Sequence, residues 1–184
     1  MGRTLHIGCG PSSKSGDVGI DIIPGPAVDV VHDLNVTPWP LADNDFDNVI
    51  AIDVLEHLDN IPAVMVELYR VCRDGAIVAV RVPSSTSPDI AADPTHRRGF
   101  SYRSFDYFDP SKQLHAYGYS NVHIAVDKFS FVSLRGWDGP RWLVRRPDGW
   151  MRRVANAWPA EYESRLAHLW PMRAVEFELR VVKS

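Results

Sequence analysis

Short apolar runs, each bounded by glycine, proline or aspartate, fill the first half of the chain. Runs of this length and composition predict β-strands. The runs are Thr4–Ile7, Val18–Ile22, Val28–Val31, Phe46–Ile52 and Ala76–Val82. Because they are almost continuously apolar and are joined by short connections, they predict a buried, mostly parallel sheet.

Helical spacing of apolar residues occurs between the last two of these runs. The apolar positions fall three or four residues apart and predict an amphipathic helix over Asn60–Cys72. These positions are Ile61, Val64, Met65, Leu68, Val71 and Cys72. Gly75 follows the last predicted turn, at a position where helices commonly end.

The second half of the chain is less regular. Ser84–Pro94 is rich in serine, threonine, proline and aspartate and predicts a loop, and we expect a helix around Tyr102–Phe108. Val122–Val132 and Ala174–Val182 have strand composition. Together these patterns predict one α/β domain with a mainly parallel sheet, whose last strand, Ala174–Val182, runs antiparallel.

The segment Gly136–Pro171 is dense in tryptophan and arginine. One helical face of Trp150–Trp158 carries Trp150, Met151, Val154, Ala157 and Trp158. This face predicts a helix that packs on the core as a lid. A lid that forms the wall of a substrate pocket is the main alternative, and docking to a membrane surface or stacking on single-stranded RNA also remain open.

A turn with two glycines follows the first predicted strand, and the second predicted strand ends beside an acid. Gly8 and Gly10 let the backbone turn tightly and approach a ligand where any Cβ would collide. Asp21, at the carboxyl end of the neighbouring strand, can accept hydrogen bonds from the two hydroxyls of a ribose. The pattern therefore predicts a site for an adenosine-containing ligand.

What this turn lacks narrows the choice of ligand. Ser13 replaces the third glycine of a dinucleotide-binding fingerprint, and the ten residues between Gly10 and Asp21 leave no room for a pyrophosphate-binding helix of normal length. S-adenosylmethionine carries no phosphate and tolerates that loss. A nicotinamide-dependent oxidoreductase is the alternative that the pattern disfavours.

Charge is unevenly distributed along the 184 residues, although the net charge is only −3. Eleven acids and no lysine or arginine lie between Asp17 and Glu67, whereas six arginines lie between Arg135 and Arg153. The acidic half suits a cationic ligand such as S-adenosylmethionine, and the basic segment suits an anionic acceptor or a membrane surface. Two solvated faces of opposite charge are an equally good interpretation.

The cysteine content and the length of the apolar runs limit the setting. Cys9 and Cys72 are too few for a disulfide framework or a zinc site, so we expect no metal and a reduced, cytoplasmic environment. No run approaches the ~18 apolar residues of a membrane span, and no apolar signal region precedes the glycine turn.

Several motifs occur in the order and at roughly the spacing of one enzyme family. They are Ile7-Gly8-Cys9-Gly10, Gly19-Ile20-Asp21, Asp33-Leu34 and the run from Phe46 to Leu58, which includes Leu55-Glu56-His57. In these motifs the chain resembles a small class I S-adenosylmethionine-dependent methyltransferase of the type-11 group, from Leu5 to about Val82. The resemblance implies a Rossmann-like, mainly parallel seven-stranded sheet with an antiparallel last strand. It also implies a single domain over residues 1–184, in which 1–83 bind the cofactor, 84–171 bind the acceptor and 172–184 form the final strand.

The resemblance further implies a role for each matching position. Asp21 would hold the ribose hydroxyls, Asp33 the adenine amino group, and Ile22 and Leu34 would sandwich the adenine ring. The glycine turn would pass beside the methionine and ribose portions, and Asp53 and Leu55 would close the site beside the sulfonium. The implied cofactor residues are Ile7, Gly8, Cys9, Gly10, Asp21, Ile22, Asp33, Leu34, Asp53 and Leu55.

Two positions depart from the family pattern. His6 stands where the family usually has an acid, and Ser12 stands where it usually has a third glycine. The short connection from Gly10 to Asp21 predicts that the first helix is lost or reduced to a turn, which would leave the cofactor site more open.

Candidate catalytic residues are His57 and His96, which follow the fourth and fifth predicted strands. Both would lie at the carboxyl edge of the sheet, where open α/β proteins bind ligands, and an imidazole suits a base near neutral pH. The competing interpretations are a helix-capping or packing His57 and a solvated His96. Arg97 and Arg98 are candidates to bind a carboxylate or phosphate of the substrate, or they form a solvated pair. Cys9 is interpreted as a small packing residue.

The sequence thus predicts transfer of a methyl group from S-adenosylmethionine to oxygen or nitrogen of a small-molecule acceptor. That acceptor would bind between the region His96–Phe108 and the segment rich in arginine and tryptophan. A nucleic-acid substrate is not expected, since families that methylate nucleobase amines usually carry other residues than Asp53-Val54-Leu55-Glu56. A nucleoside-binding protein without catalysis is the alternative that His6 and the short first connection motivate. The sequence leaves the oligomeric state open.

Overall fold

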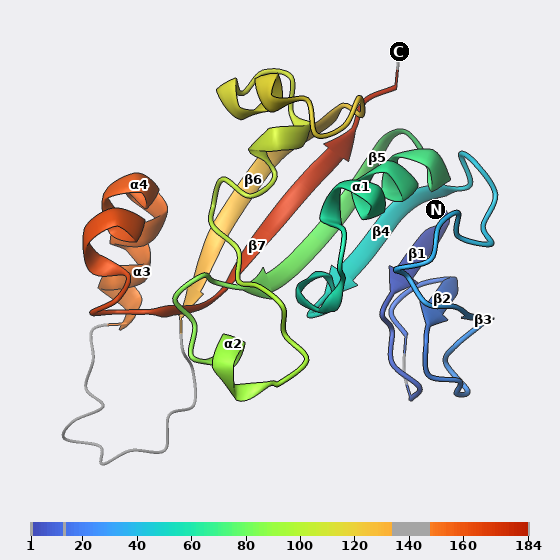
Figure 1. Ribbon diagram of the computed structural model, residues 1–184, viewed down its shortest axis with the longest axis horizontal. Helices are drawn as coiled ribbons and strands as arrows, with labels where there is room; N and C mark the ends of the chain where they lie inside the picture. Colours follow the sequence, from blue (N-terminus) through green and yellow to red (C-terminus); the bar gives the residue numbers. More distant parts are fainter. Residues whose placement is uncertain (1, 13, 134–147, 184) are drawn as a thin grey trace.

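The computed structural model of the chain describes residues 2–12, 14–133 and 148–183. Within these residues, seven strands form one sheet in the order β3-β2-β1-β4-β5-β7-β6 (Figure 1). The strands are β1 Thr4–Ile7, β2 Val18–Asp21, β3 Val30–Val31, β4 Phe46–Ile52, β5 Cys72–Pro83, β6 Ile124–Ser133 and β7 Met172–Val181. Strands β1 to β5 pair in parallel, and β7 pairs antiparallel with β5 and β6. The predicted mainly parallel sheet with an antiparallel last strand is confirmed.

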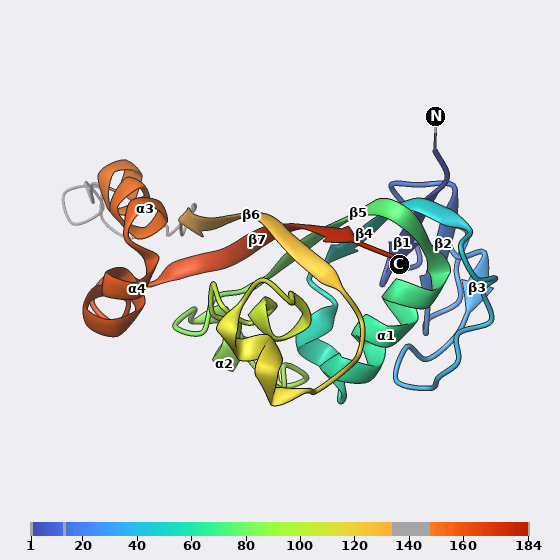
Figure 2. The same cartoon turned by 90° about the horizontal axis from the view of Figure 1, so that it is seen from above.

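The described helices are short apart from two. They are α1 Ile61–Val71, α2 Asp89–Ala92, α3 Asp148–Ala157 and α4 Pro159–Glu161, with single turns η1 Leu55–His57, η2 Asp106–Phe108, η3 Gln113–Tyr117 and η4 Tyr162–Leu166. Helices α1 and α2 lie on the same side of the sheet (Figure 2). Among these helices, none covers the opposite face of β1, β4 and β5.

The side-chain pattern of β7 explains why one face of the sheet can stay uncovered. Phe177 and Leu179 are buried in the core, whereas the alternate residues Glu176 and Arg180 are exposed. An antiparallel strand with one apolar and one charged side can face water on the charged side. The alternation in the sequence of this strand therefore predicts which of its residues face the helices.

Helix α1 is close to its predicted extent but ends differently. It begins after Asn60, whose side chain accepts a hydrogen bond from Ala63 N at 3.1 Å. The helix ends at Val71, within one residue of the predicted Cys72, but Gly75 does not terminate it, because Gly75 already belongs to β5. Gly75 has φ +76° where the pairing of β4 with β5 shifts register, so its freedom serves a bulge in the strand.

The connection between β1 and β2 contains no helix among its described residues, as predicted. Backbone hydrogen bonds hold its two ends to the strands: Gly8 N and Cys9 N donate to Ile20 O, and Asp17 N donates to Thr4 O. Backbone groups therefore make these contacts, and they hold the glycine turn next to the end of β2.

The predicted helix over Tyr102–Phe108 is wrong. The structure has only the single turn η2, while Phe100, Phe105 and Phe108 are all buried in the core. Spacings of three to five residues between apolar side chains fit a helix, but irregular backbone that follows the core surface meets the same requirement.

The apolar face predicted for Trp150–Trp158 is also wrong in part. Met151 and Ala155 of α3 are buried, but Trp150 and Trp158 are 49% and 59% exposed. The helix packs beside β6 near the end of the sheet (Figure 1). Because its partner is a sheet edge rather than a broad core surface, a narrow stripe suffices. Among the described residues, the helices lack the length and the apolar character that a membrane span requires.

Candidate functional site

The candidate residues gather where the parallel strands end. The glycine turn follows β1, Asp21 ends β2, Asp53 follows β4, and Arg81 lies near the end of β5. Carboxyl ends of parallel strands share one edge of a sheet, and this edge is the usual ligand site of open α/β folds.

Gly8 and Gly10 are required by their backbone conformation. Both have positive φ, +63° and +71°, which side-chain-bearing residues rarely adopt. A Cβ on Gly8 would also lie 2.4 Å from Cγ2 of Val54, so the glycine turn packs directly against the segment that follows β4. The first turn and the end of β4 are therefore adjoining walls of one site.

The carboxylate of Asp21 is turned under the glycine turn. Its Oδ2 accepts a hydrogen bond from Gly10 N at 2.8 Å, its Oδ1 accepts one from Ile23 N at 2.9 Å, and the residue is 9% exposed. A carboxylate has about four acceptor positions, so two remain for hydroxyl donors. Orientation of this acid is fixed before any ligand arrives.

The residues assigned to the adenine ring differ in how accessible they are. Ile22 is 61% exposed beside Asp21, whereas Leu34 is buried and its carbonyl accepts a hydrogen bond from Trp39 Nε1 at 3.1 Å. Asp33 is half-buried, and its Oδ1 accepts hydrogen bonds from Asn35. An exposed isoleucine beside a pre-oriented acid leaves apolar surface for a flat ring.

Besides Leu34, three further implied cofactor residues have buried apolar side chains. Ile7 and Leu55 are fully buried in the core, and Cys9 is 8% exposed with its Sγ 3.7 Å from Ala27 O. The packing role expected for Cys9 is confirmed. What these three residues can offer a ligand is their backbone.

His6, at the position where the family usually has an acid, is held by the β1–β2 connection. Its Nδ1 accepts a hydrogen bond from Ser15 N at 3.1 Å. Burial lowers the pKa of His6, against the opposing charge of Asp21. The imidazole therefore serves as a neutral acceptor that closes the short connection.

Asp53 and Arg81 form an ion pair beside the glycine turn. Arg81 Nε donates to Asp53 Oδ1 at 3.1 Å and Nη2 pairs with Oδ2. Hydrogen bonding to this carboxylate raises the pKa of Arg81. Asp53 has φ +51°, and its N–H donates to Arg81 O at 2.9 Å. A non-glycine residue at such a φ is uncommon and often marks a functional turn.

A cleft of about 780 Å³ opens at this edge beside Asp53. We call it the carboxyl-edge cleft. Its walls come from η1, the α2 loop and the adjoining ends of β5, β6 and β7. Its ionisable lining residues are Asp53, Glu56, Asp89, Asp93, Glu176, Arg81, Arg173, His57 and His96.

Glu56, His57 and His96 form a cluster in the wall of the carboxyl-edge cleft. One ligand atom from each lies within 4.8 Å of the others, and His96 Nε2 is 3.8 Å from Glu56 Oε1. Glu56 is only 1% exposed, and no described residue donates a hydrogen bond to its Oε2. Burial raises the pKa of Glu56 to about 7. The predicted convergence of His57 and His96 at this edge agrees with the structure.

Neighbouring oxygens decide which nitrogen of each imidazole carries the proton. His96 Nδ1 lies 3.0 Å from Asp89 O, which only accepts, so Nδ1 is protonated. Thr95 Oγ1 donates to Asp93 Oδ1 at 2.6 Å and therefore accepts from His57 Nδ1 at 2.9 Å. In the neutral rings, the lone pair of each histidine is then on Nε2.

Arg97 and Arg98 are not brought to the carboxyl-edge cleft. Arg97 pairs with Asp59 at 2.7 Å and donates to His57 O, and Arg98 donates to Asp59 O at 2.9 Å. Both arginines therefore tie the loop after β5 to the connection between η1 and α1. The expectation that they bind substrate is not supported by this placement.

Among the described residues, the predicted acceptor site is brought together only in part. The buried phenylalanines before η3 lie in the core, and α3 lines a hollow that shares Val132, Ser133 and Glu176 with the carboxyl-edge cleft. The arginines and tryptophans of 134–147 lie outside the described residues. Of the expected acceptor region, the part that reaches the carboxyl-edge cleft is the loop around His96.

Sequence reasoning missed most of the ionisable residues of the carboxyl-edge cleft. The sequence names Glu56 only as part of the motif Leu55-Glu56-His57, and it does not single out Arg81 or Asp93. A charged Arg81 within the otherwise apolar strand 76–82 was the available signal. Nothing local marks Asp93, because its role depends on Thr95 and on a distant histidine.

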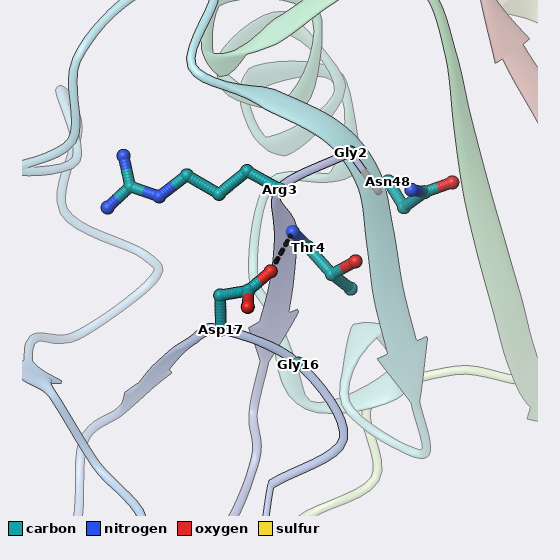
Figure 3. Close-up of a pocket in the computed structure, with 6 residues that line it drawn as sticks. All are labelled: Gly2, Arg3, Thr4, Gly16, Asp17 and Asn48. Carbon is teal, nitrogen blue, oxygen red and sulfur yellow. Dashed lines mark hydrogen bonds between the residues drawn. The ribbon is translucent and has the colours of Figure 1, made fainter.

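A third hollow, of about 700 Å³, lies at the opposite, amino edge of β1 (Figure 3). It is lined by Gly2, Arg3, Thr4, Gly16, Asp17 and Asn48. The Asp17 carboxylate accepts a hydrogen bond from Thr4 N at 2.8 Å, so its acid caps the start of the strand. This edge holds none of the predicted site residues.

Comparison with known proteins agrees with this arrangement. Residues 5–80 match the family model for a methyltransferase domain. Over these residues the chain matches a methyltransferase domain, and its sheet has the fold of class I methyltransferases. No curated protein sequence matches it.

Solved structures share this methyltransferase fold at low identity. A S-adenosylmethionine-dependent methyltransferase from Archaeoglobus fulgidus is 18% identical with a TM-score of 0.58, over 97% of this chain and 85% of that one. The [4+2]-cyclase SpnF is 17% identical with a TM-score of 0.55, over 100% and 75%. A third, from a complex between the Haloferax volcanii Trm112 methyltransferase activator and a methyltransferase, is 11% identical with a TM-score of 0.54, over 98% and 82%. At these identities the likeness concerns the fold.

Proposed function

We propose that this methyltransferase domain transfers the methyl group of S-adenosylmethionine to oxygen or nitrogen of a small-molecule acceptor bound in the carboxyl-edge cleft. The observation that carries the proposal is the pre-oriented Asp21 carboxylate under the glycine turn. An acid in this place suits the two ribose hydroxyls of an adenosine ligand, and the turn offers no helix for a pyrophosphate.

The cofactor would lie across the ends of β1, β2 and β4. Asp21 would hold the ribose, exposed Ile22 would contact the adenine ring, and Asp33 would accept from the adenine amino group. The backbone of Gly8 and Gly10 would pass beside the methionine portion. Because Gly8 packs against Val54, the sulfonium end would then lie beside Asp53, at the mouth of the carboxyl-edge cleft.

Methyl transfer depends mainly on how the acceptor atom is positioned relative to the methyl group. A lone pair of the acceptor attacks the methyl carbon in line with the carbon–sulfur bond, that bond breaks, and S-adenosylhomocysteine leaves with the electron pair. A hydroxyl or ammonium acceptor also loses a proton. His57 and His96 stand in the cleft wall where that proton would be released, and they are the groups we assign to accept it.

A second candidate is a protein that binds the same nucleoside without methyl transfer. The neutral His6 in place of an acid and the reduced β1–β2 connection favour it, and the fold-related SpnF is described as a cyclase. Release of labelled methyl from S-adenosylmethionine with any acceptor would decide for transfer. Binding without release across a broad acceptor panel would decide for the second candidate.

Calorimetric titration of S-adenosylhomocysteine tests the cofactor site. Asp21→Ala removes acceptors for the ribose hydroxyls and should weaken binding by about 10- to 100-fold, since a hydrogen bond to a charged group contributes ~1.5–3 kcal/mol. Asp17→Ala is the matched control: it removes an acid at the amino edge and should leave the affinity unchanged. Equal affinity of the two variants, both folded by circular dichroism, would remove Asp21 from the site.

A further inference from the structure

We propose that Glu56, His57 and His96 form a binding site for one divalent transition-metal ion in the wall of the carboxyl-edge cleft. The ligand set is two imidazole nitrogens and one carboxylate oxygen. Two histidines and a carboxylate with open positions are a common donor set for catalytic zinc and for non-haem iron. The cysteine count led to the expectation of no metal, but this donor set contains no cysteine.

The positions of the three side chains already favour a shared ion. Their ligand atoms lie within 4.8 Å of one another, so small side-chain movements bring them around one centre. The surroundings of Glu56 are stronger evidence for a bound ion than these distances. It is 1% exposed, and its Oε2 has no hydrogen-bond partner among the described residues. A buried polar atom without a partner is costly, and a cation at this point would satisfy it.

The surroundings of the two imidazoles match those of metal-bound histidines. Such histidines usually donate their second ring N–H to a carbonyl or carboxylate, which fixes the ring and leaves the other nitrogen for the metal. His96 Nδ1 donates to Asp89 O at 3.0 Å. His57 Nδ1 donates to Thr95 Oγ1, which in turn donates to Asp93. Both rings therefore present Nε2 as the free ligand atom.

Charge at the carboxyl-edge cleft also favours a cation. Five carboxylates line it against two arginines. Arg81 and Arg173 are each paired, with Asp53 and with Asp89. Asp93 Oδ2 lies 3.8 Å from His96 Nε2, within reach of a fourth coordination position. The field at the cluster is therefore negative, and the open side of the site faces the cleft.

This inference deepens the proposed function through the acceptor. An ion held here would occupy Nε2 of His57 and His96, so with the ion bound these histidines would be its ligands rather than proton acceptors. The ion would coordinate an oxygen of the acceptor and make its hydroxyl more acidic, so that the proton is lost to solvent and methylation at oxygen is helped. The substrate class indicated is then a hydroxyl compound with a second oxygen or nitrogen that can bind the same ion. Metal binding itself does not depend on the cofactor, so the two proposals can fail separately.

The test titrates zinc chloride into the full chain after its metals have been stripped with a chelator. Calorimetry should give a single saturable site, and cobalt in place of zinc should give visible absorption bands of a nitrogen- and oxygen-ligated ion. Glu56→Gln and His96→Gln should each weaken zinc binding by about 100-fold or more. Thr95→Val should weaken it by about 10-fold, because loss of a group that orients a ligand typically costs 10- to 100-fold.

His168→Gln is the matched control, because it removes an exposed histidine outside the cleft and should leave zinc affinity unchanged. Circular dichroism identifies variants that fold, and Thr95→Val keeps the test decisive if Glu56→Gln does not. The proposal is wrong if the wild-type chain binds no zinc, or if folded cluster variants bind it like wild type. It is equally wrong if His168→Gln weakens binding as much as His96→Gln, which would indicate adventitious surface binding. A parallel titration of S-adenosylhomocysteine with chelator present tests the cofactor site alone.

Discussion

The first glycine of the β1–β2 turn is required for two reasons: its backbone conformation disfavours a side chain, and a side chain would clash with its neighbours. Gly8 has φ +63°, and a Cβ there would lie 2.4 Å from Cγ2 of Val54. Gly75 has φ +76° but open space around it. Comparing the two positions therefore distinguishes the free-energy cost of a left-handed backbone from that of a steric clash.

Substitution by alanine should therefore affect the two glycines unequally. Gly75→Ala carries only the conformational cost, about 1–2 kcal/mol of the free energy of unfolding. Gly8→Ala adds overpacking against Val54, about 1–3 kcal/mol more. Urea denaturation of both variants measures the difference. Equal destabilisation would mean that Val54 moves aside freely and that the turn is not packed against the segment after β4.

At the scale of elements, an edge strand is protected by a helix. Strand β6 lies at the end of the sheet, where backbone groups have no further strand to pair with. The side chain of Asn156 in α3 binds both groups of Phe131: its Oδ1 accepts from Phe131 N at 2.7 Å, and its Nδ2 donates to Phe131 O at 3.5 Å. The Asn156 amide thus makes the two hydrogen bonds that a neighbouring strand would make with Phe131, and it fixes α3 against β6.

Asn156→Leu should destabilise the domain by about 1–3 kcal/mol, because the two backbone groups of Phe131 lose their partner under a helix. Asn121→Leu is the control, since Asn121 is exposed and such changes usually stay within about 0.5 kcal/mol. Chemical denaturation compares the two, and light scattering on heating should show earlier aggregation for Asn156→Leu. Similar stability of both variants would show that α3 is held by its apolar contacts alone.

On the scale of the whole molecule, the helices that precede β6 lie on one face of the sheet (Figure 2). The proposed ligand site lies at the carboxyl edge of the parallel strands. The glycine turn has no first helix behind it, so a bound nucleoside would supply contacts that the chain lacks there. Ligand that binds only the folded state stabilises it by mass action, by ~2.7 kcal/mol at a concentration of 100 times its dissociation constant.

Thermal unfolding with S-adenosylhomocysteine at that concentration should therefore occur roughly 5–10 °C higher, given ~2–4 °C per kcal/mol for a domain of this size. NAD at the same concentration should leave the midpoint unchanged, because the turn has no helix N-terminus for a pyrophosphate. Stabilisation by NAD alone would overturn the proposed cofactor and favour an oxidoreductase.

The residues of the carboxyl-edge cleft are brought together by contacts between distant segments, which no local sequence pattern predicts. His96 reaches Glu56 because Arg97 N donates to Glu56 O at 2.9 Å, which ties the loop after β5 to η1. Arg97 and Arg98, singled out for a substrate, instead form part of that tie. Adjacent residues of one sequence motif thus point to different places, and charge alone does not say which of them reaches the cleft.

By itself the sequence determined the strands, the glycine turn, the lost first helix and the acid at the end of β2. Apolar runs and left-handed glycines are local requirements, met or violated within a few residues. Only the tertiary structure decided which face of the sheet is covered, which side of α3 is buried, and which ionisable groups meet in the carboxyl-edge cleft. Those outcomes depend on partners distant in the chain, and the free energy of burying or pairing a group belongs to both partners at once.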